Sequence, residues 1–318
     1  MFTKGSLFYI GQRTVLIVFT VLAVSSIVFL GIHRLPGNAF FSERLRGSQE
    51  AVLLHHYHLD EPLLVQYKTF IGNLLHGDLG ESLIFRGVKI APLVAREATV
   101  SAEVGVTALI FTVGLGILFG VLAAMRQNTW VDYLLSTTSV IGYSMPNFVI
   151  ATFLLLVFGI YLDNLTNGAI FYEIGWSGTY GTPGQIWLPA IALGFPYASI
   201  VARLTRASML EVIRQDYVRT ARAKGLSERV VVLRHALRNA LIPVVTILGP
   251  LVIGIITGSV VIENIFGIPG LGKEFVTSIL SRDYNIVIGV FTMYAALVGL
   301  ANLGVDLLYT VLDPRIRY

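Results

Sequence analysis

The chain has 318 residues, of which 55% are hydrophobic and 13% charged, with a mean hydropathy of +0.74, no cysteine and a formal net charge of +4. Soluble domains carry about 25% charged residues, so this composition indicates an all-α polytopic membrane protein. The lack of cysteine excludes disulfides, thiolate metal sites and cysteine nucleophiles. The positive charge does not indicate a nucleic-acid partner, because the basic residues gather where membrane topology places them.

Residues 1–32 contain Lys4 and Arg13, followed by an apolar run from Thr14 to Ile32. A secretory signal peptide opens in a similar way, but its apolar region has only about 7–15 residues. The run here approaches the roughly 20 residues that cross a bilayer, and no clear small-residue cleavage site closes it. We therefore expect residues 1–32 to form a cytoplasmic N-terminus and an uncleaved first transmembrane helix.

Residues 33–98 differ from their surroundings, because they hold seven Lys/Arg and seven Asp/Glu. Their length predicts a loop domain outside the membrane with short helices of its own. His55, His56 and His58 suggest a metal site, but consecutive histidines do not face one way on a helix, and no acid or cysteine stands at ligand spacing. We expect no metal there.

Five further transmembrane helices are expected near residues 100–125, 133–161, 186–202, 241–262 and 285–311. The first of these carries Gly116 and Gly120, whose small-xxx-small spacing lets membrane helices approach closely. Two others contain Pro189, Pro196 and Pro250. Prolines commonly kink membrane helices, which would suit a moving gate, although they are frequent in membrane helices of every kind.

The distribution of charge predicts the topology. With six spans both termini lie in the cytoplasm, as do the loops after the second and fourth spans. Residues 203–238 have nine Lys/Arg against three Asp/Glu, whereas residues 162–186 have no Lys or Arg. The C-terminal end carries Arg315 and Arg317. These counts follow the positive-inside rule, so we expect residues 33–98 and 162–186 to be external.

A strongly basic stretch, residues 219–238, interrupts the apolar second half of the chain. Apolar residues recur at helical spacing over 209–221, which predicts a helix that ends at Gly225, where a left-handed backbone is needed. Ser227 then suits the N-cap of a second helix, with the acidic Glu228 in its first turn. One face of this second helix is expected to carry four apolar residues: Val230, Leu233, Leu237 and Leu241.

The basic stretch resembles the cytoplasmic EAA loop of ABC importer permeases. Ala221 and Gly225 occupy consensus positions, whereas Arg219 stands in place of the consensus Glu and His235 in place of Ile. Residues 216–227 are similar to the version found in the peptide-transport branch. Three more segments resemble that branch, namely the Leu-Asp-x-Pro-Leu, Gln-Tyr and Gly-Asp-Leu-Gly series over 59–80, the signature 263–272, and the C-terminal 313–317.

The resemblance implies three parts: 1–32 as the cytoplasmic N-terminus and first helix, 33–98 as an external loop domain, and 99–318 as a five-helix permease core with a cytoplasmic coupling loop at 203–240. It implies the inner membrane of a bacterium. It also implies a second homologous permease subunit, two cytoplasmic ATPase subunits, an external peptide-binding protein and peptide cargo. The residues expected to couple to the ATPases are Arg219, Thr220, Ala221, Arg222, Ala223, Lys224, Gly225, Leu226 and Ser227.

Mechanistically, closure of the ATPases would push on this turn and convert an inward-facing cavity into an outward-facing one. No catalytic residue and no cofactor are expected in this chain, because the partners carry the chemistry. The cargo stays open among oligopeptides, dipeptides, glutathione and nickel chelates. The signature over 263–272 favours oligopeptides.

Residues 267–274 nearly match a phosphate-binding P-loop. Such a loop needs Ser or Thr after its Lys and a strand before its first Gly. Here Glu274 follows Lys273, and an apolar span precedes Gly267. We therefore expect no nucleotide binding at this segment.

The competing function is a proton-driven secondary carrier or channel without an ATPase, which would need paired acids within the membrane. Glu103 and Asp306 fall in expected spans, but neither has a second acid three or four residues away. We expect Glu103 to be water-exposed and Asp306 to make a structural hydrogen bond. A membrane-embedded enzyme is disfavoured because the histidines all fall outside the spans.

Overall fold

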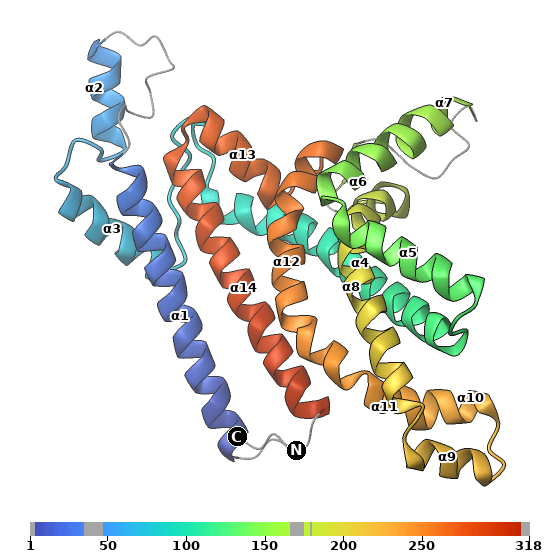
Figure 1. Cartoon of the computed structure of the whole chain (residues 1–318). Helices are drawn as coiled ribbons and strands as arrows, with labels where there is room; N and C mark the ends of the chain where they lie inside the picture. Colours follow the sequence, from blue (N-terminus) through green and yellow to red (C-terminus); the bar gives the residue numbers. More distant parts are fainter. Residues whose placement is uncertain (1–3, 35–46, 166–174, 179, 313–318) are drawn as a thin grey trace. The chain divides into compact units, whose positions relative to one another are not determined.

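The computed structural model describes residues 4–34, 47–165, 175–178 and 180–312, and within them the chain is helical, with one isolated bridge between Glu81 and Lys89 and no longer strand (Figure 1). In chain order the elements are α1 (Lys4–Ile32), α2 (Gly47–His56), α3 (Leu63–Leu75), α4 (Ile90–Met125), α5 (Trp130–Ser144), α6 (Asn147–Leu154), the π-helix η1 (Leu155–Tyr161), α7 (Leu162–Leu165), α8 (Pro183–Val212), α9 (Asp216–Ala223), α10 (Glu228–Val230), the π-helix η2 (Val231–Ala236), α11 (Leu237–Ala240), α12 (Ile242–Phe266), α13 (Leu271–Ser281) and α14 (Tyr284–Leu312).

Five of the described helices are long and apolar enough to cross a membrane: Phe8–Ile32 within α1, the whole of α4, α8 and α12, and Tyr284–Leu307 within α14. A sixth candidate is α5 together with the run α6–η1, which bends by 108° at the junction. The predicted all-α, polytopic fold is confirmed. Helix α4 begins at Ile90, earlier than the expected span near 100–125.

The expected helix near 133–161 is not continuous, because it breaks at Met145 and Pro146. Pro146 has no backbone N–H, and Met145 has the extended backbone (φ −85°, ψ 131°) that a following proline favours. By contrast, α8 continues through Pro189 and Pro196. The break therefore falls at Pro146, which is not among the three prolines expected to kink a span.

The described residues divide into two compact units, one within Met1–Ser101 and Pro269–Gly304, the other within Ala102–Ile268 and Val305–Asp313. In the first unit, α1 and α14 are joined by a hydrogen bond between the Ser25 and Thr292 hydroxyls (2.8 Å). The main buried core of this unit joins the start of α4 to α13 and α14, through Ile90, Val94, Leu271, Ile286 and Val290.

The buried carboxylate of Asp283 fastens the loop that holds Ser82, Leu83 and Ile84 to the N-terminal end of α14. It accepts the backbone N–H groups of Leu83 (3.2 Å) and Ile84 (3.3 Å) and the hydroxyl of Ser82. It also accepts the N–H of Ile286 within α14 (3.3 Å). A buried carboxylate with so many donors is satisfied without a cation, so this contact fixes the path of the chain toward α4.

In the second unit, α4 and α8 approach closely where glycine leaves room. A Cβ atom on Gly116 would lie 2.6 Å from the Cβ of Val201, and one on Gly120 would lie 2.6 Å from the carbonyl oxygen of Ala202. The close approach predicted from the small-xxx-small spacing is confirmed. Helix α8 is the most enclosed spanning helix, with 67% of its apolar window buried against 33% or less for the other four.

Helices α4 and α8 run in the same direction. The Thr112 hydroxyl of α4 donates to the Gly194 carbonyl of α8 (3.0 Å), and further along both helices Gly120 meets Thr205. The chain must therefore return, between the end of α4 and the start of α8, to the end of the second unit at which α4 enters it. Helix α5 makes the first part of that return beside α8, since Asp132 pairs with Arg206 and a Cβ atom on Gly142 would lie 2.7 Å from the Phe195 ring.

Candidate functional site: the basic turn between α9 and α10

The basic turn lies beyond the end of α8, where α9, α10 and α11 follow one another (Figure 1). Helix α8 ends at Val212, and Gln215 takes an extended N-cap backbone (φ −71°, ψ 150°) before α9 starts at Asp216. The expectation of one helix over 209–221 is therefore wrong. The apolar residues on both sides of the break still meet, because Val218 and Ala221 of α9 pack with Val212, the last residue of α8. Asp216 suits the positive N-terminal end of its own helix.

The left-handed backbone predicted at Gly225 is confirmed, with φ at +77° just after the end of α9. The N–H of Gly225 bonds to the Arg222 carbonyl (2.9 Å), which closes the turn. Ser227 has N-cap geometry (φ −62°, ψ 146°), as predicted, and its carbonyl accepts from the N–H of Val230 (2.9 Å). Its side chain makes no capping hydrogen bond within the described residues.

The second helix of the turn is largely a π-helix, η2, and this changes which residues face inward. Val231, Val232, Ala236 and Ala240 are buried, whereas Leu233 is 54% exposed. The predicted apolar face is therefore wrong at Leu233, whereas Leu237 packs against the cluster that contains Ala236 and Ala240. A π-helical turn holds more residues than an α-helical turn, so spacing counted at 3.6 residues per turn loses its register there.

Two small cores make the turn rigid. In the first, Val218, Ala221 and Val231 pack together with Val212. Of the nine residues predicted to couple to ATPases, Ala221 is buried (5% exposed), and the other eight lie on the surface. The sequence did not distinguish Ala221 from its neighbours, because the break before α9 sets the inward face.

A second core fixes the turn to the transmembrane helices. Ala236 and Ala240, together with Val232, are buried against Met209 of α8 and Ala124 at the end of α4. The Asn239 side-chain amide also donates to the Tyr217 hydroxyl (2.7 Å), which ties α11 to α9. A force on the turn would therefore reach the ends of both α4 and α8.

The cations of the turn are not equally available to a partner. Arg222 forms a two-point ion pair with Glu228 across the turn (Nη2–Oε1 2.7 Å, Nε–Oε2 3.2 Å). The hydrogen bond from Arg222 lowers the pKa of the Glu228 carboxyl below its usual value. Arg219 lies 3.7 Å from Asp216, with both side chains strongly exposed, and Lys224 has no ion pair with any residue in the described ranges.

Sequence reasoning missed a buried ion pair in the second unit. Arg206 of α8 binds Asp132 in the first turn of α5 (Nε–Oδ1 2.6 Å, Nη2–Oδ2 2.7 Å), and the Asp132 side chain is only 4% exposed. The sequence did offer one indication of this pair, since Asp132 is an acid at the start of an otherwise apolar helix. Glu103, expected to be water-exposed, is instead half-buried, and its carboxylate accepts the Gly181 N–H (3.2 Å). Asp306 is also half-buried.

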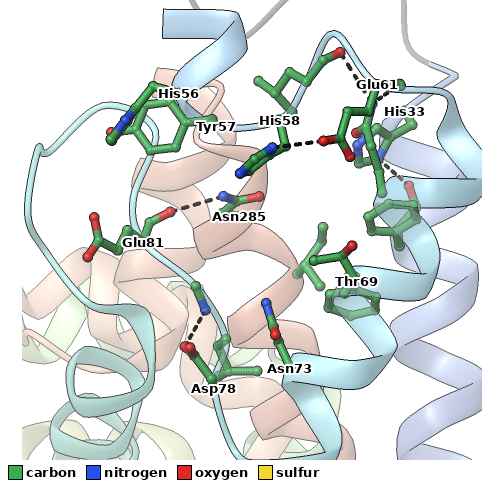
Figure 2. Close-up of a pocket in the computed structure, with 17 residues that line it drawn as sticks. His33, His56, Tyr57, His58, Glu61, Thr69, Asn73, Asp78, Glu81 and Asn285 are labelled. Carbon is green, nitrogen blue, oxygen red and sulfur yellow. Dashed lines mark hydrogen bonds and ion pairs between the residues drawn. The ribbon is translucent and has the colours of Figure 1, made fainter.

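A pocket of about 280 Å³ lies within the first unit, bounded by α1, α3, the start of α14 and the segments 56–61 and 78–81 (Figure 2). Its polar groups largely bond to neighbours in the same chain: His58 Nδ1 to Glu61 (2.9 Å), and Asp78 to the N–H of Gly80 (2.8 Å). Over the described ranges, no group of three or more His, Cys, Asp or Glu could hold a metal ion. The hydrogen bond to Gly80 shows that Asp78, in the Gly-Asp-Leu-Gly motif, stabilises the local turn.

The segment that resembles a P-loop connects two helices. Gly267 ends α12 with a left-handed backbone (φ +70°), and Gly270 is the N-cap of α13. A helix rather than a strand precedes the first glycine, so the segment lacks the strand that a P-loop needs.

Comparison with known proteins places the chain in a family. The family model described as "Binding-protein-dependent transport system inner membrane component" matches residues 116–318. The oligopeptide transport system permease protein OppB of Haemophilus influenzae is 44% identical over 284 residues, covering 89% of this chain and 90% of that protein. The dipeptide transport system permease protein DppB of Bacillus subtilis is 42% identical, covering 94% of each chain.

The oligopeptide transport system permease protein OppB of Escherichia coli K12 is 41% identical over 300 residues, covering 94% of this chain and 95% of that protein. A crystal structure of an amino acid ABC transporter with histidines covers 71% of this chain and 94% of its own, with 17% identity and a TM-score of 0.49. From the family match and the near full-length relatives, the chain belongs to the binding-protein-dependent transport system inner membrane component family.

Proposed function

We propose that this chain is a transmembrane permease subunit of an ATP-driven peptide importer in the bacterial inner membrane. The observation that carries the proposal is the exposed basic turn at 219–227, fixed by buried residues to the ends of α4 and α8. Relatives named oligopeptide and dipeptide transport permease proteins support a peptide cargo, and we favour oligopeptides. The chain forms half of the translocation path, and a second homologous permease forms the other half.

Two cytoplasmic ATPase subunits bind the turn in this proposal, and an external binding protein delivers the peptide. ATP hydrolysis takes place in the ATPases, so this chain has no catalytic residue. Closure of the ATPases pushes on residues 219–227. The buried contacts of Ala221 keep the turn from deforming, so the push moves the ends of α4 and α8 and converts an inward-facing cavity into an outward-facing one.

We further propose that both termini and the loops at 126–129 and 203–240 are cytoplasmic, and that residues 33–98 are external. The ion pair between Asp132 and Arg206 supports a common side for the two loops, because it joins the start of α5 to the last turns of α8. The excess of Lys and Arg over acids in 203–238 supports the cytoplasm as that side.

The function is tested with the chain purified with its partner subunits and reconstituted into proteoliposomes. With the binding protein and a labelled oligopeptide present, uptake should require ATP and should be unaffected by an uncoupler that collapses the proton gradient. Uptake that is driven by a proton gradient without ATP would establish the competing secondary carrier instead.

Docking of the turn onto an ATPase is tested at Ala223, which is exposed at the end of α9. Ala223→Trp changes no charge but changes the shape of the surface, so ATPase subunits should no longer co-purify with the permease. Ala223→Ser is the matched control and should retain them. Ala221→Trp is not a useful probe, because Ala221 is buried and tryptophan there would disrupt the core of the turn.

An attachment of the turn to anionic lipid, at about 1 kcal/mol for each basic residue near the surface, predicts the opposite pattern. Lys224→Gln would then weaken the attachment, whereas Ala223→Trp would leave it intact. ATPase subunits that stay bound to the Ala223→Trp variant but are lost from Lys224→Gln would contradict docking by shape.

A further inference from the structure

The ion pair between Asp132 and Arg206 has the geometry of a fixed joint between α5 and α8. The guanidinium meets the carboxylate at two points (2.6 and 2.7 Å), the arrangement that gives Arg–carboxylate pairs their directional strength. The Asp132 side chain is 4% exposed and that of Arg206 30%. Breaking such a pair leaves a buried charge without compensation, so the two helices resist sliding past one another.

Asp132 also accepts hydrogen bonds from residues close to it in the sequence. Its carboxylate accepts the backbone N–H of Asn128 (3.0 Å) and the hydroxyl of Ser136 (3.2 Å). The first contact ties the carboxylate to the turn between α4 and α5, and the second ties it to the next turn of α5. The carboxylate therefore has a fixed orientation, and a shift of Arg206 is passed to the helix rather than absorbed by a side-chain rotation.

Arg206 lies within two turns of the end of α8 at Val212, and the basic turn (residues 219–227) follows shortly after that end. Met209, less than one turn beyond Arg206, is fully buried against Ala236 and Ala240 of the segment that follows the turn. The last turns of α8 thus contact η2 and α11, which follow the basic turn, through Met209, and they contact α5 through Arg206.

At its other end, α5 meets α8 again and then stops. A Cβ atom on Gly142 would lie 2.7 Å from the Phe195 ring, so the two helices are close there. Just beyond this contact the chain bends by 108° at Met145 and Pro146. Helix α5 is therefore attached to α8 at both ends, and the nearest break in backbone hydrogen bonding lies at the bend.

We propose that Asp132 and Arg206 are positioning residues that transmit displacement of the basic turn from α8 to α5, so that α5 moves as a rigid lever about Met145 and Pro146. The inference rests on the proposed transport function and adds the route by which the push of an ATPase reaches the membrane. Neither residue contacts the peptide or the nucleotide in this scheme.

The measured quantity is the number of peptides imported per ATP hydrolysed by the reconstituted complex. Asp132→Asn removes the charge at nearly constant shape and should lower this ratio about ten-fold or more, because the Arg206 guanidinium loses its charged partner. ATP hydrolysis should continue, and the ATPases should stay bound. Arg206→Lys keeps the charge without the two-point contact and should have an intermediate ratio.

Glu211→Gln is the matched control, since it also neutralises a charge on the last turns of α8, but at an exposed position. It should leave the ratio unchanged. A chemical rescue uses the absence of cysteine in the chain. The double variant Asp132→Cys with Arg206→Cys should have a low ratio, and joining the two thiols with a short bis-maleimide should recover most of it.

An unchanged ratio in Asp132→Asn would overturn the inference. A parallel fall of uptake and ATP hydrolysis, or loss of the ATPases from the complex, would also overturn it, because the pair would then serve only to hold the fold. Failure of the proposed function gives a different result: the wild-type complex would hydrolyse ATP without importing peptide, and both proposals would fall.

Discussion

At the scale of single residues, Gly225 has the backbone conformation on which the basic turn depends. Its φ is +77°, and no atom lies within 4 Å of where a Cβ would stand, so a substitution acts through the backbone alone. Gly225→Val should cost about 1–2 kcal/mol and reduce peptide uptake in membrane vesicles. Gly225→Asn should retain uptake, because Asn tolerates the left-handed region. Equal losses in both variants would contradict this role of the backbone.

The ion pair across the same turn predicts a dependence on pH. Arg222 lowers the pKa of Glu228 from the usual 4.5, so the stabilisation is present above pH 4.5 and is lost as the pH falls through the lower folded value. Because the side chains are 37% and 50% exposed, it contributes well under about 1 kcal/mol.

Glu228→Gln should therefore speed amide hydrogen exchange in the turn slightly at neutral pH, after correction for intrinsic rates. In acid, where Glu228 is protonated in both the folded and unfolded states, the variant and the wild type should exchange alike. A difference of the same size at both pH values would mean that Glu228 acts through its shape and not its charge.

Residues whose role is local could be predicted from the sequence. A glycine followed by Ser and Glu indicates a turn and a new helix, and Gly225 and Ser227 have the expected backbones. Asp132 and Arg206 could not be paired in advance, because they are 74 residues apart and only the packing of α5 on α8 brings them together.

At the scale of elements, the contact between α4 and α8 gives a matched comparison on one helix. A Cβ on Gly120 would lie 2.6 Å from the Ala202 carbonyl, whereas a Cβ on Gly114 would meet nothing within 4 Å. Gly120→Ala should destabilise the protein by about 1–3 kcal/mol through overpacking. Gly114→Ala should be neutral or slightly stabilising, because alanine favours helix. Thermal unfolding in detergent measures both, and equal midpoints would contradict the close packing.

Element boundaries were less predictable than element identity. The spans near 186–202 and 241–262 could be predicted because an apolar run of that length rarely forms anything but a membrane helix. The inward face of η2 was missed, because apolar spacing was counted at the α-helical period and a π-helix departs from it. Whether a given proline breaks a helix could also not be predicted from the sequence, since the chain breaks at Pro146 whereas α8 continues through Pro189.

At the scale of the whole molecule, the proposed orientation can be tested with single cysteines, because the natural chain has none. Val52 is 68% exposed on α2, so Val52→Cys should react with an impermeant maleimide added outside intact cells whose outer barrier is permeable to it. Ser227→Cys, in the basic turn, should react only after the inner membrane is opened. The reverse pattern would invert the topology and contradict the proposed function.

The parallel course of α4 and α8 bears on the number of times that the chain crosses the membrane. In the proposed topology α4 and α8 both cross the bilayer, and because they are parallel they cannot be consecutive crossings. The bent pair of α5 with α6–η1 then makes the crossing in the opposite sense. We therefore propose that the bent pair is a crossing rather than a re-entrant hairpin, which makes the total number of crossings even. An even total returns a polypeptide to its starting compartment. Reporters fused ahead of α1 and behind α14 would then signal from the same compartment, whereas an odd total would separate them.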